Sequence, residues 1–319
     1  MNVRWGFAGL GRMAELAAEA LDESPRSELV AVGSRSREKA QAFAAGHGVP
    51  SEHAHGTYAD LIADAEVDAI YVATPHPQHT DIALGAIAAG KPVLVEKAFT
   101  ASVEDTRAII EAARAAGVFC MEAMWTRFNP GVVRIRELIA EGAIGEVRGV
   151  HGDLTAARTY DPADRLFAAE LGGGAVLDLG VYVISFAQHF LGTPTVVHAT
   201  GGLYPNGVES DFSIMLGFPG GRSSTLSGGF TTHGPGRMMI LGTQGWIDMH
   251  PRFHRAPSFT VWRGGESETH EFAYSYAHEF EHVAECLDRG LTESPIMPLA
   301  DTLVVQEVMA EVLAQVRGA

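Results

Sequence analysis

The sequence predicts an α/β protein with an N-terminal doubly wound parallel sheet and a C-terminal α+β domain whose open sheet is mostly antiparallel. Over residues 1–124, short runs rich in Val, Ile and Ala alternate with helical stretches, which is typical of a parallel sheet covered on both faces. From residue 125 onward, strands follow one another across short turns and several alternate apolar with polar residues. We therefore expect two domains, 1–124 and 125–319.

The N-terminal strands are short apolar runs bounded by glycine or proline, as in "AIYVATP". Helical composition fills the intervals, beginning with the stretch after the first strand and with "REKAQAFAA" after the second. Right-handed crossovers between such strands build a doubly wound sheet. The predicted strands are 3–10, 29–35, 69–75, 92–98 and 118–125, and the first two helices are 12–22 and 37–45.

The C-terminal half begins and ends with helices and is otherwise dominated by strands. Alternation in "SDFSIMLGF" and "RSSTLSGGF" indicates that one face of the sheet is buried and the other is not. The predicted helices are 129–141, 173–191, 276–290 and 299–317. The predicted strands are 146–154, 195–204, 209–218, 222–230, 237–249, 258–264 and 268–274.

The composition of the chain argues against nucleic-acid binding and membrane association. The chain has 319 residues, of which 46% are hydrophobic, enough for a large core and two domains. Its net charge of −16 repels nucleic acid and anionic membrane, so neither is an expected partner. No apolar run approaches the ~20 residues of a membrane helix, and the N-terminus does not resemble a signal peptide. The two cysteines, Cys120 and Cys286, are far apart in sequence, and a cytoplasmic protein is expected.

A glycine-rich turn follows the first strand and opens a helix. Gly9, Gly11 and Ala14 form G-x-G-x-x-A in "GFAGLGRMA". The first glycine permits the tight turn, the second lets the backbone approach a pyrophosphate at the helix N-terminus, and the alanine allows close helix–strand packing. An ordinary glycine-rich turn is the alternative. The expected cofactor contacts in this turn are Gly9, Leu10, Gly11, Arg12 and Met13.

The end of the second strand discriminates between the two nicotinamide cofactors. NAD enzymes usually place a carboxylate there, on the ribose 2′-OH, but this strand ends Gly33-Ser34-Arg35-Ser36. A hydroxyl from Ser34, a planar fork from Arg35 and the ammonium of Lys39 suit a 2′-phosphate. The sequence therefore favours NADP over NAD, and a solvated arginine at a helix start is the alternative for Arg35.

Two pairs of residues suit proton chemistry. Glu96 and Lys97 lie at the carboxyl end of strand 92–98, the edge where doubly wound sheets bind ligands, and both are expected to contact the cofactor. An ammonium there would stabilise an alkoxide or polarise a carbonyl. Asp178 and Tyr182 are four residues apart and would share a helical face, and a phenol beside an ammonium can exchange a proton. A surface lysine and a core tyrosine are the alternatives.

The motifs resemble those of the Gfo/Idh/MocA oxidoreductases, and nearest to them the branch containing dimeric dihydrodiol dehydrogenase and NADP-dependent D-xylose dehydrogenase. They are "GFAGLGRMA", "TPHPQH", "VEKAF", "MEAMWTRFNP" and "ELGGGAVLDLGVY". The resemblance implies a Rossmann domain, a homodimer formed through the C-terminal sheet, and hydride transfer between nicotinamide and a sugar, polyol or cyclic diol. It implies Lys97 as the catalytic lysine, Tyr182 as its acid/base partner, and Asp178 to orient them or bind a hydroxyl. It places Arg35 and Lys39 on the 2′-phosphate, and Thr74, Pro75, His76 and His79 in the loop lining the cofactor.

The chain departs from the family pattern at two positions. Ala98 follows the lysine where proline is common, and Tyr182 stands where many members have histidine. Tyrosine is what the dihydrodiol and xylose branch carries. A non-catalytic NADP-binding regulator and an inositol-type dehydrogenase using NAD remain the alternative functions.

Further candidates rest on position alone. Trp125 and Arg127 follow the strand at 118–125, where Trp125 would stack on substrate or pack at the joint between domains. Tyr160 and Arg165 precede the Asp178 helix and would close over substrate. "HEFEH", residues 278–282, contains H-E-x-x-H, a zinc motif on a helix, but no third ligand is evident, and a chance match on a helix that packs one face and exposes the other is the favoured explanation. No metal is expected.

Overall fold

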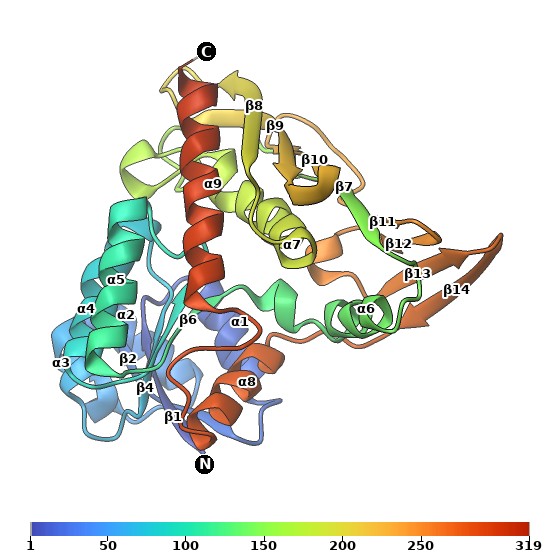
Figure 1. Cartoon of the computed structure of the whole chain (residues 1–319). Coiled ribbons are helices and arrows are strands. Elements are labelled where there is room, and N and C mark those ends of the chain that lie inside the picture. The colour runs from blue at the N-terminus through green and yellow to red at the C-terminus, as the bar shows by residue number, and fades with distance from the viewer. Residues whose placement is uncertain (1, 319) are drawn as a thin grey trace. The chain divides into compact units, whose positions relative to one another are not determined.

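A computed structural model describes residues 2–318, which form two compact units, each with its own sheet (Figure 1). The first unit contains the chain up to Trp125 together with Ser275–Leu303. The second contains Thr126–Tyr274 and the residues from Val304 onward. The predicted division at 124/125 placed all of 275–303 in the second domain, whereas the structure packs this segment with the first unit.

Six parallel strands form the sheet of the first unit among the described residues, in the order β3-β2-β1-β4-β5-β6. From β1 the chain adds strands first on one side (β2, β3) and then on the other (β4, β5, β6), so the switch point of this Rossmann sheet lies between β1 and β4. Ala8 lies opposite both Gly33 and Val72, so the loops that follow β1, β2 and β4 leave the same edge. The strands are β1 (Val3–Ala8), β2 (Ser27–Gly33), β3 (Ala54–His55), β4 (Ala69–Val72), β5 (Val93–Glu96) and β6 (Cys120–Ala123).

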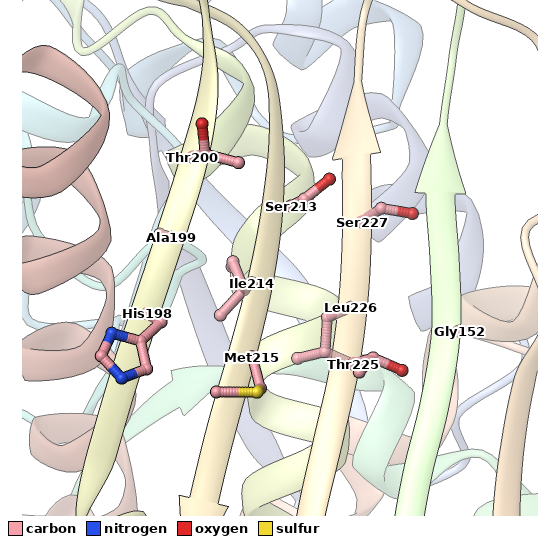
Figure 2. Close-up of a pocket in the computed structure, with 10 residues that line it drawn as sticks. All are labelled: Gly152, His198, Ala199, Thr200, Ser213, Ile214, Met215, Thr225, Leu226 and Ser227. Atoms are coloured by element: carbon pink, nitrogen blue, oxygen red, sulfur yellow. The ribbon is translucent and has the colours of Figure 1, made fainter. Parts of the chain in front are cut away.

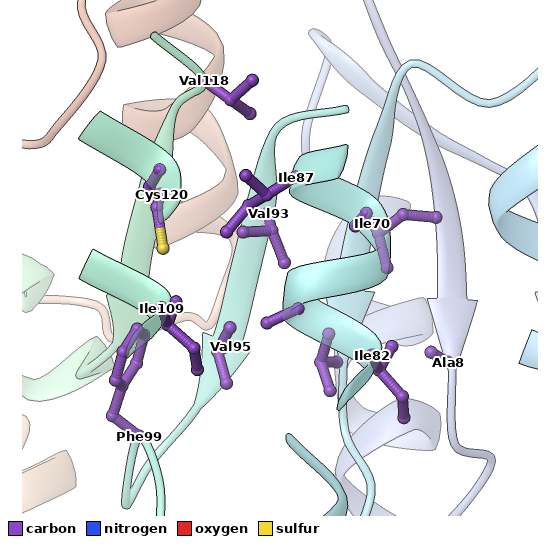
Figure 3. Packing of buried hydrophobic residues seen from close by; sticks show 14 of the residues in the cluster. Ala8, Ile70, Ile82, Ile87, Val93, Val95, Phe99, Ile109, Val118 and Cys120 are labelled. Carbon is purple, nitrogen blue, oxygen red and sulfur yellow. The ribbon is translucent and has the colours of Figure 1, made fainter. Parts of the chain in front are cut away.

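Both faces of this sheet are buried, as the near-continuous apolar strands predict. On one face, Val93 and Val95 belong to a buried cluster with Ile82 of α4 and Ile109 of α5 (Figure 3). On the other face, Phe280 of α8 packs against aromatic rings of β1 and β4. Its ring centroid lies 5.1 Å from Trp5, 6.3 Å from Phe7 and 5.4 Å from Tyr71.

The helices of the first unit differ in how they begin. Ser36, Thr57 and Ser102 cap α2, α3 and α5, each accepting a hydrogen bond from the backbone N–H three residues later. Gly11 at the start of α1 supplies no capping side chain. The helices are α1 (Arg12–Leu21), α2 (Arg37–Gly46), α3 (Tyr58–Ala63), α4 (His79–Ala88), α5 (Val103–Ala116) and α8 (Ala277–Asp288), with short 3₁₀ turns η1 (Ser51–His53) and η2 (His76–Gln78).

The second unit is built on a mostly antiparallel sheet of eight strands within residues 2–318, in the order β14-β13-β12-β11-β7-β10-β9-β8. Only the neighbours β7 and β10 in that sheet run parallel. The strands are β7 (Val147–Thr155), β8 (Val196–Leu203), β9 (Glu209–Phe218), β10 (Arg222–Gly229), β11 (Met238–Gly242), β12 (Gly245–Met249), β13 (Ser258–Arg263) and β14 (Glu266–Glu271).

The predicted strand 237–249 is wrong in one respect, because it is a hairpin of β11 and β12. Gly242 and Gly245 flank its turn, and each lies too close to neighbouring backbone for a side chain. A Cβ on Gly242 would lie 2.1 Å from the Ile144 carbonyl oxygen, and one on Gly245 would lie 2.2 Å from that of Trp262. The glycines therefore allow the chain to reverse at "TQG", a short turn by composition that lies inside the stretch predicted as one strand.

The predicted helix 173–191 is also corrected. Its α-helical part, α7, spans Val181–Leu191 and is preceded by a single π turn, η5 (Val176–Gly180). Single π turns are frequent at functional sites, and Asp178 lies in this one. The remaining elements of the unit are α6 (Pro130–Ala140), α9 (Leu299–Arg317) and short turns η3 (Trp125–Phe128), η4 (Ala169–Leu171), η6 (Pro219–Gly221) and η7 (Phe253–Arg255), with α9 and η3 crossing the division between units.

One segment of the described chain, Ala169–Leu191, is long and apolar enough to cross a membrane by length and composition alone. This finding qualifies the expectation that no apolar run approaches that length. In the fold, 83% of its most apolar window is buried, which is the pattern of a core helix.

Candidate functional site

The glycine turn after β1 has the two properties that a dinucleotide site requires. Gly9 has φ +93°, and a Cβ there would lie 2.7 Å from Thr74 Cγ2 and 2.8 Å from the Ala73 carbonyl carbon. Only glycine therefore fits this position. A Cβ on Gly11 would meet no atom within 4 Å, so the space beside that glycine is open. Ala14 is fully buried against the sheet.

The N-terminus of α1 is available to an anion. No described side chain caps its first turn, so backbone N–H groups and the positive end of the helix dipole face the open space beside Gly11. Arg12 is exposed, whereas Leu10 and Met13 are half-buried at the turn. Contact between these residues and a bound pyrophosphate stays a prediction.

Positive side chains without acidic partners follow β2. Arg35 and Lys39 are exposed, and neither forms an ion pair within residues 2–318. Ser34 is half-buried; its N–H donates to the His55 carbonyl (3.1 Å), and its Oγ accepts from the Ser36 N–H (3.2 Å). Because the carboxylates nearby in sequence do not neutralise Arg35 or Lys39, both can bind a phosphate.

The loop after β4 contains a polar atom that lacks a partner. Thr74 Oγ1 is buried without a hydrogen-bond partner in the described chain, and its side chain lies against the Gly9 turn. An orphaned hydroxyl at this position fits a bound cofactor, since buried polar groups are normally satisfied. Pro75 is half-buried and opens the short η2 turn, and His76 within that turn is buried with its ring centroid 5.7 Å from that of His79.

His79 holds two loops together and is itself fully buried. Its Nε2 lies 2.7 Å from the Thr74 carbonyl oxygen, and its Nδ1 lies 3.1 Å from the Phe99 carbonyl oxygen. Burial lowers the pKa of His79, although the carbonyl contacts oppose this shift. The ring therefore joins the loop after β4 to the loop that follows Lys97.

Lys97 begins the loop after β5 and is half-buried. Its backbone N–H donates to Glu96 Oε2 (3.2 Å), and the Phe99 N–H donates to Glu122 Oε1 (3.2 Å). The Lys97–Ala98 peptide is cis, at the position where the family commonly has proline. Two buried carboxylates therefore fix the backbone that presents the lysine.

Glu96 points inward and belongs to a buried acidic cluster that sequence reasoning missed. Tyr71 donates to Glu96 Oε1 at 2.6 Å, and burial together with Glu96 and Glu279 raises the pKa of Tyr71 well above its usual range. Burial and then Glu96 also raise the pKa of Glu279. The sequence did contain a signal for this cluster, because Glu96 is a charged residue at the end of the otherwise apolar strand "VLVE".

The second unit presents its own group of candidate residues. Tyr182 is buried, with its ring centroid 5.3 Å from that of His254, a neighbour the sequence did not suggest. Asp178 is half-buried, and its Oδ1 lies 3.8 Å from Nη2 of Arg165, whose side chain is half exposed. The structure thus brings Arg165 to Asp178.

The remaining candidates make contacts within the fold. Trp125 packs on Tyr276 with ring centroids 4.6 Å apart. Arg127 is buried and donates to Ser185 Oγ (3.1 Å) and Gln188 Oε1 (2.6 Å) of α7.

Tyr160 does not join Arg165 and Asp178 in the described contacts. It stacks on Tyr204 with ring centroids 4.6 Å apart and meets Phe167 at 5.3 Å. Substrate contact by Trp125, Arg127, Tyr160 and Arg165 stays a prediction.

Two of the H-E-x-x-H residues of α8, Glu279 and His282, are buried in the fold. His282 Nε2 lies 2.7 Å from Ser294 Oγ and 3.3 Å from Cys286 Sγ, and Glu279 is buried near Glu96. Ser294 Oγ already accepts the Ile296 and Met297 N–H groups, so its own hydrogen is free to go to His282. Burial and then Arg289 lower the pKa of His282 to about 4, which keeps the ring neutral.

An open hollow of about 660 Å³ lies on the second sheet (Figure 2). The exposed side chains of Ser213 and Met215 line it, whereas Phe212, which precedes Ser213 in β9, is buried on the opposite face, against Gly180 of η5. The hollow is therefore on the face of the sheet opposite the Asp178 turn, and its lining includes none of Lys97, Asp178 and Tyr182. Its lining is Gly152, His198, Ala199, Thr200, Ser213, Ile214, Met215, Thr225, Leu226 and Ser227.

Two family models match the chain. Residues 3–124 match the oxidoreductase family with an NAD-binding Rossmann fold, and residues 132–248 match the GFO/IDH/MocA C-terminal domain. The first covers the six-stranded sheet, and the second covers the eight-stranded sheet from β7 to β12 but not β13 or β14.

Relatives match over the full length. Trans-1,2-dihydrobenzene-1,2-diol dehydrogenase of Xenopus laevis is 36% identical over 99% of this chain and 98% of its own, and that of Homo sapiens is 30% identical over 100% and 97%. Aldose-aldose oxidoreductase of Caulobacter crescentus, solved with glycerol, superposes with TM-score 0.91 and 27% identity over 100% of this chain and 98% of its own. A 3-ketoreductase of Actinomadura kijaniata, solved with NADP and TDP-benzene, superposes with TM-score 0.86 and is 25% identical, covering 99% of this chain and 98% of its own.

These matches agree with the architecture of two units, a Rossmann sheet followed by a mostly antiparallel sheet. The relatives are named as dehydrogenases and oxidoreductases that act on diols and sugars. The chain therefore belongs to the Gfo/Idh/MocA family of oxidoreductases and is an enzyme with an NAD(P)-binding Rossmann domain.

Proposed function

We propose that this enzyme uses NADP to interconvert a carbinol and a carbonyl group on a sugar, polyol or cyclic diol. The end of β2 carries the proposal, since it has no carboxylate for a ribose 2′-OH but has exposed, unneutralised Arg35 and Lys39. An arginine fork binds phosphate with two parallel hydrogen bonds, and a lysine adds a point charge.

The residues of the first unit fit the whole cofactor. The first turn of α1 would bind the pyrophosphate beside Gly11, where the space is open. Ser34, Arg35 and Lys39 would bind the 2′-phosphate. Thr74 Oγ1 would gain the partner that it lacks in the described chain, and Pro75, His76 and the loop held by His79 would line the cofactor.

Lys97 and Tyr182 are proposed to handle the proton on the substrate oxygen. The bound cofactor supplies or accepts the hydride. Lys97 would stabilise negative charge on the reacting oxygen, and the Tyr182 hydroxyl would donate or accept the proton. Asp178 would orient these groups or bind a substrate hydroxyl. The backbone of Lys97 is fixed by Glu96, which suits a side chain that must be positioned closely.

A turnover assay tests the substrate class. The panel should contain trans-dihydrodiols, aldoses such as xylose, and inositols, each with NADP and NAD, because relatives are named for diols and aldoses. We expect oxidation of a diol or aldose with NADP preferred. Turnover of inositols with NAD alone would favour the inositol-type alternative, and binding of NADP without turnover of any compound would contradict the proposed activity.

A homodimer formed through the second sheet is part of the proposal. Several large apolar side chains are exposed in this unit, including Met215, Met239, Trp246 and Trp262. Trp246 and Trp262 stack face to face on neighbouring strands, with ring centroids 5.3 Å apart. Except for His198, the lining of the hollow has no ionisable side chain, in a chain of net charge −16. A second copy would present the same lining, so the two hollows could face each other without charge repulsion.

A reducing compartment such as the cytoplasm is the proposed location. Cys120 and Cys286 are both free and buried, and unpaired cysteines are usual where thiols stay reduced. Localisation of a tagged chain by cell fractionation checks this.

A further inference from the structure

Three side chains from separate elements converge at the edge of the first sheet. His53 ends η1, His55 ends β3, and Asp64 follows the last residue of α3. His53 Nδ1 lies 2.7 Å and His55 Nε2 lies 2.8 Å from the same oxygen, Asp64 Oδ2. Across residues 2–318, this is the one group of three or more His, Cys, Asp or Glu side chains whose ligand atoms lie close enough to share a metal ion.

The donor set matches a particular class of metal. Two imidazole nitrogens and one carboxylate oxygen are ligands for Zn²⁺ and similar transition metals, whereas Mg²⁺ and Ca²⁺ prefer oxygen. The side chains of His53, His55 and Asp64 are 25%, 17% and 7% exposed, so water can reach the cluster and complete a four-coordinate ion.

The carboxylate is oriented for this role. Asp64 Oδ1 accepts the Glu66 N–H at 2.9 Å, which directs Oδ2 toward the two rings. Burial opposes ionisation of Asp64, but hydrogen bonds from His53, the Glu66 N–H and His55 outweigh it and lower its pKa to about 2. Lys91 Nζ contacts the Asp64 and Val67 carbonyl oxygens at 2.5 and 2.9 Å, so its charge is directed at the backbone.

Little movement separates the hydrogen-bonded cluster from a metal site. Ligand bonds of about 2.0–2.1 Å around a tetrahedral ion place neighbouring ligand atoms about 3.3 Å apart. The two ring nitrogens would therefore retreat from Asp64 Oδ2 by roughly half an ångström. Both rings are partly exposed, so side-chain rotation can supply this shift.

We propose that His53, His55 and Asp64 form a Zn²⁺ site that joins η1 and the edge strand β3 to the C-terminal end of α3. The site is separate from the proposed redox chemistry and from the H-E-x-x-H string of α8. A metal there would stabilise the edge of the sheet, because it binds the folded arrangement and not the unfolded chain.

Calorimetric titration of Zn²⁺ into the chelator-treated full chain at neutral pH tests the proposal. We expect about one ion per chain and a zinc-dependent rise in melting temperature. Asp64→Asn and His55→Gln should each weaken binding by more than about tenfold, which is at least the cost of losing a supporting second-shell partner. His278→Gln is the matched control. It replaces a histidine that precedes Glu279 in the H-E-x-x-H string of α8, and it should leave zinc binding unchanged.

A spectroscopic measurement covers the case in which a variant does not fold. Co²⁺ bound to wild type by two nitrogens and one oxygen in four-coordinate geometry gives strong visible absorption bands, and Zn²⁺ should abolish them. Absence of these bands, absence of zinc binding by wild type, retention of wild-type affinity by both ligand variants, or loss of binding in His278→Gln would each overturn the proposal.

Discussion

Lys97 is the residue on which the proposed chemical step depends most. Its backbone is fixed by the neighbouring Glu96, and the following loop is fixed by Glu122 and His79. Lys97→Met preserves the side-chain length and removes the charge. We expect the turnover number to fall by about 10²–10⁴-fold, the range typical of a lost proton-handling group.

The dissociation constant of NADPH, measured by fluorescence titration, should remain within about twofold in Lys97→Met, because the proposed phosphate contacts lie elsewhere. Equal losses of turnover and cofactor affinity would instead indicate that Lys97 is structural.

Arg35 is the residue on which the proposed preference for NADP over NAD depends. Removing a charge-assisted contact with the 2′-phosphate costs about 1.5–3 kcal/mol, so Arg35→Ala should weaken NADPH binding by roughly 10–100-fold. NADH has no 2′-phosphate, and its affinity should not change. Arg37→Ala, at a neighbouring exposed arginine, controls for general loss of positive charge. If Arg35→Ala leaves both affinities unchanged, Arg35 does not contact the cofactor.

At the scale of one element, the two glycines of the turn between β1 and α1 should affect different properties: Gly9 the stability of the fold and Gly11 the binding of the cofactor. A methyl group on Gly9 would meet Thr74 and Ala73 below 3 Å in a backbone of φ +93°. We expect Gly9→Ala to lower the free energy of unfolding by about 2 kcal/mol or more, from strain and overpacking together.

Gly11→Ala should behave in the opposite way. Its φ of −98° suits any residue, and the added methyl meets no protein atom. The melting temperature should hold, while the methyl blocks close approach of a pyrophosphate and weakens NADPH binding by more than about tenfold. Wild-type NADPH affinity in this variant would show that no pyrophosphate lies there.

Helix α8 contains the H-E-x-x-H string, but two of its residues, Glu279 and His282, are buried and serve the packing of the helix. Phe280 packs on the aromatic face of the sheet, and His282 is held by Ser294. The pKa of His282 is about 4 in the folded chain against 6.5 in the reference state. The unfolded chain therefore binds the proton more readily between these values, and stability must rise with pH across that window.

Urea unfolding of wild type and His282→Gln between pH 4 and 6.5 measures this contribution. The free energy of unfolding of wild type should fall by about 1–3 kcal/mol more than that of the variant as the pH is lowered through that window. Parallel pH profiles would mean that the buried histidine does not titrate in this range.

At the scale of the whole molecule, the proposed homodimer would cover the exposed apolar side chains of the second sheet. Trp246→Glu would place a charge in the proposed interface, and light scattering should report about 34.0 kDa for the variant and twice that for wild type. Val133→Glu is the matched control, since Val133 is equally an exposed apolar residue but lies on α6. A monomeric wild type would exclude the dimer.

Much of the fold could be predicted from the sequence because it depends on local patterns. Apolar strands, the Gly9–Gly11 turn and the alternation in "SDFSIMLGF" predict both sheets and the edge that carries Lys97. The hairpin of β11 and β12 and the π turn at Asp178 were not predicted. The hairpin depends on close backbone approaches at Gly242 and Gly245, which composition does not reveal.

The sequence by itself determined the fold class, the family and the residue types at the end of each Rossmann strand, because these follow from hydrophobic periodicity and short motifs. Only the tertiary structure decided that Glu279 is buried near Glu96, that His79 joins two loops, and that two histidines converge on Asp64. Each of these depends on contacts between segments that fold side by side, and the distance between such segments is not encoded in their spacing along the chain.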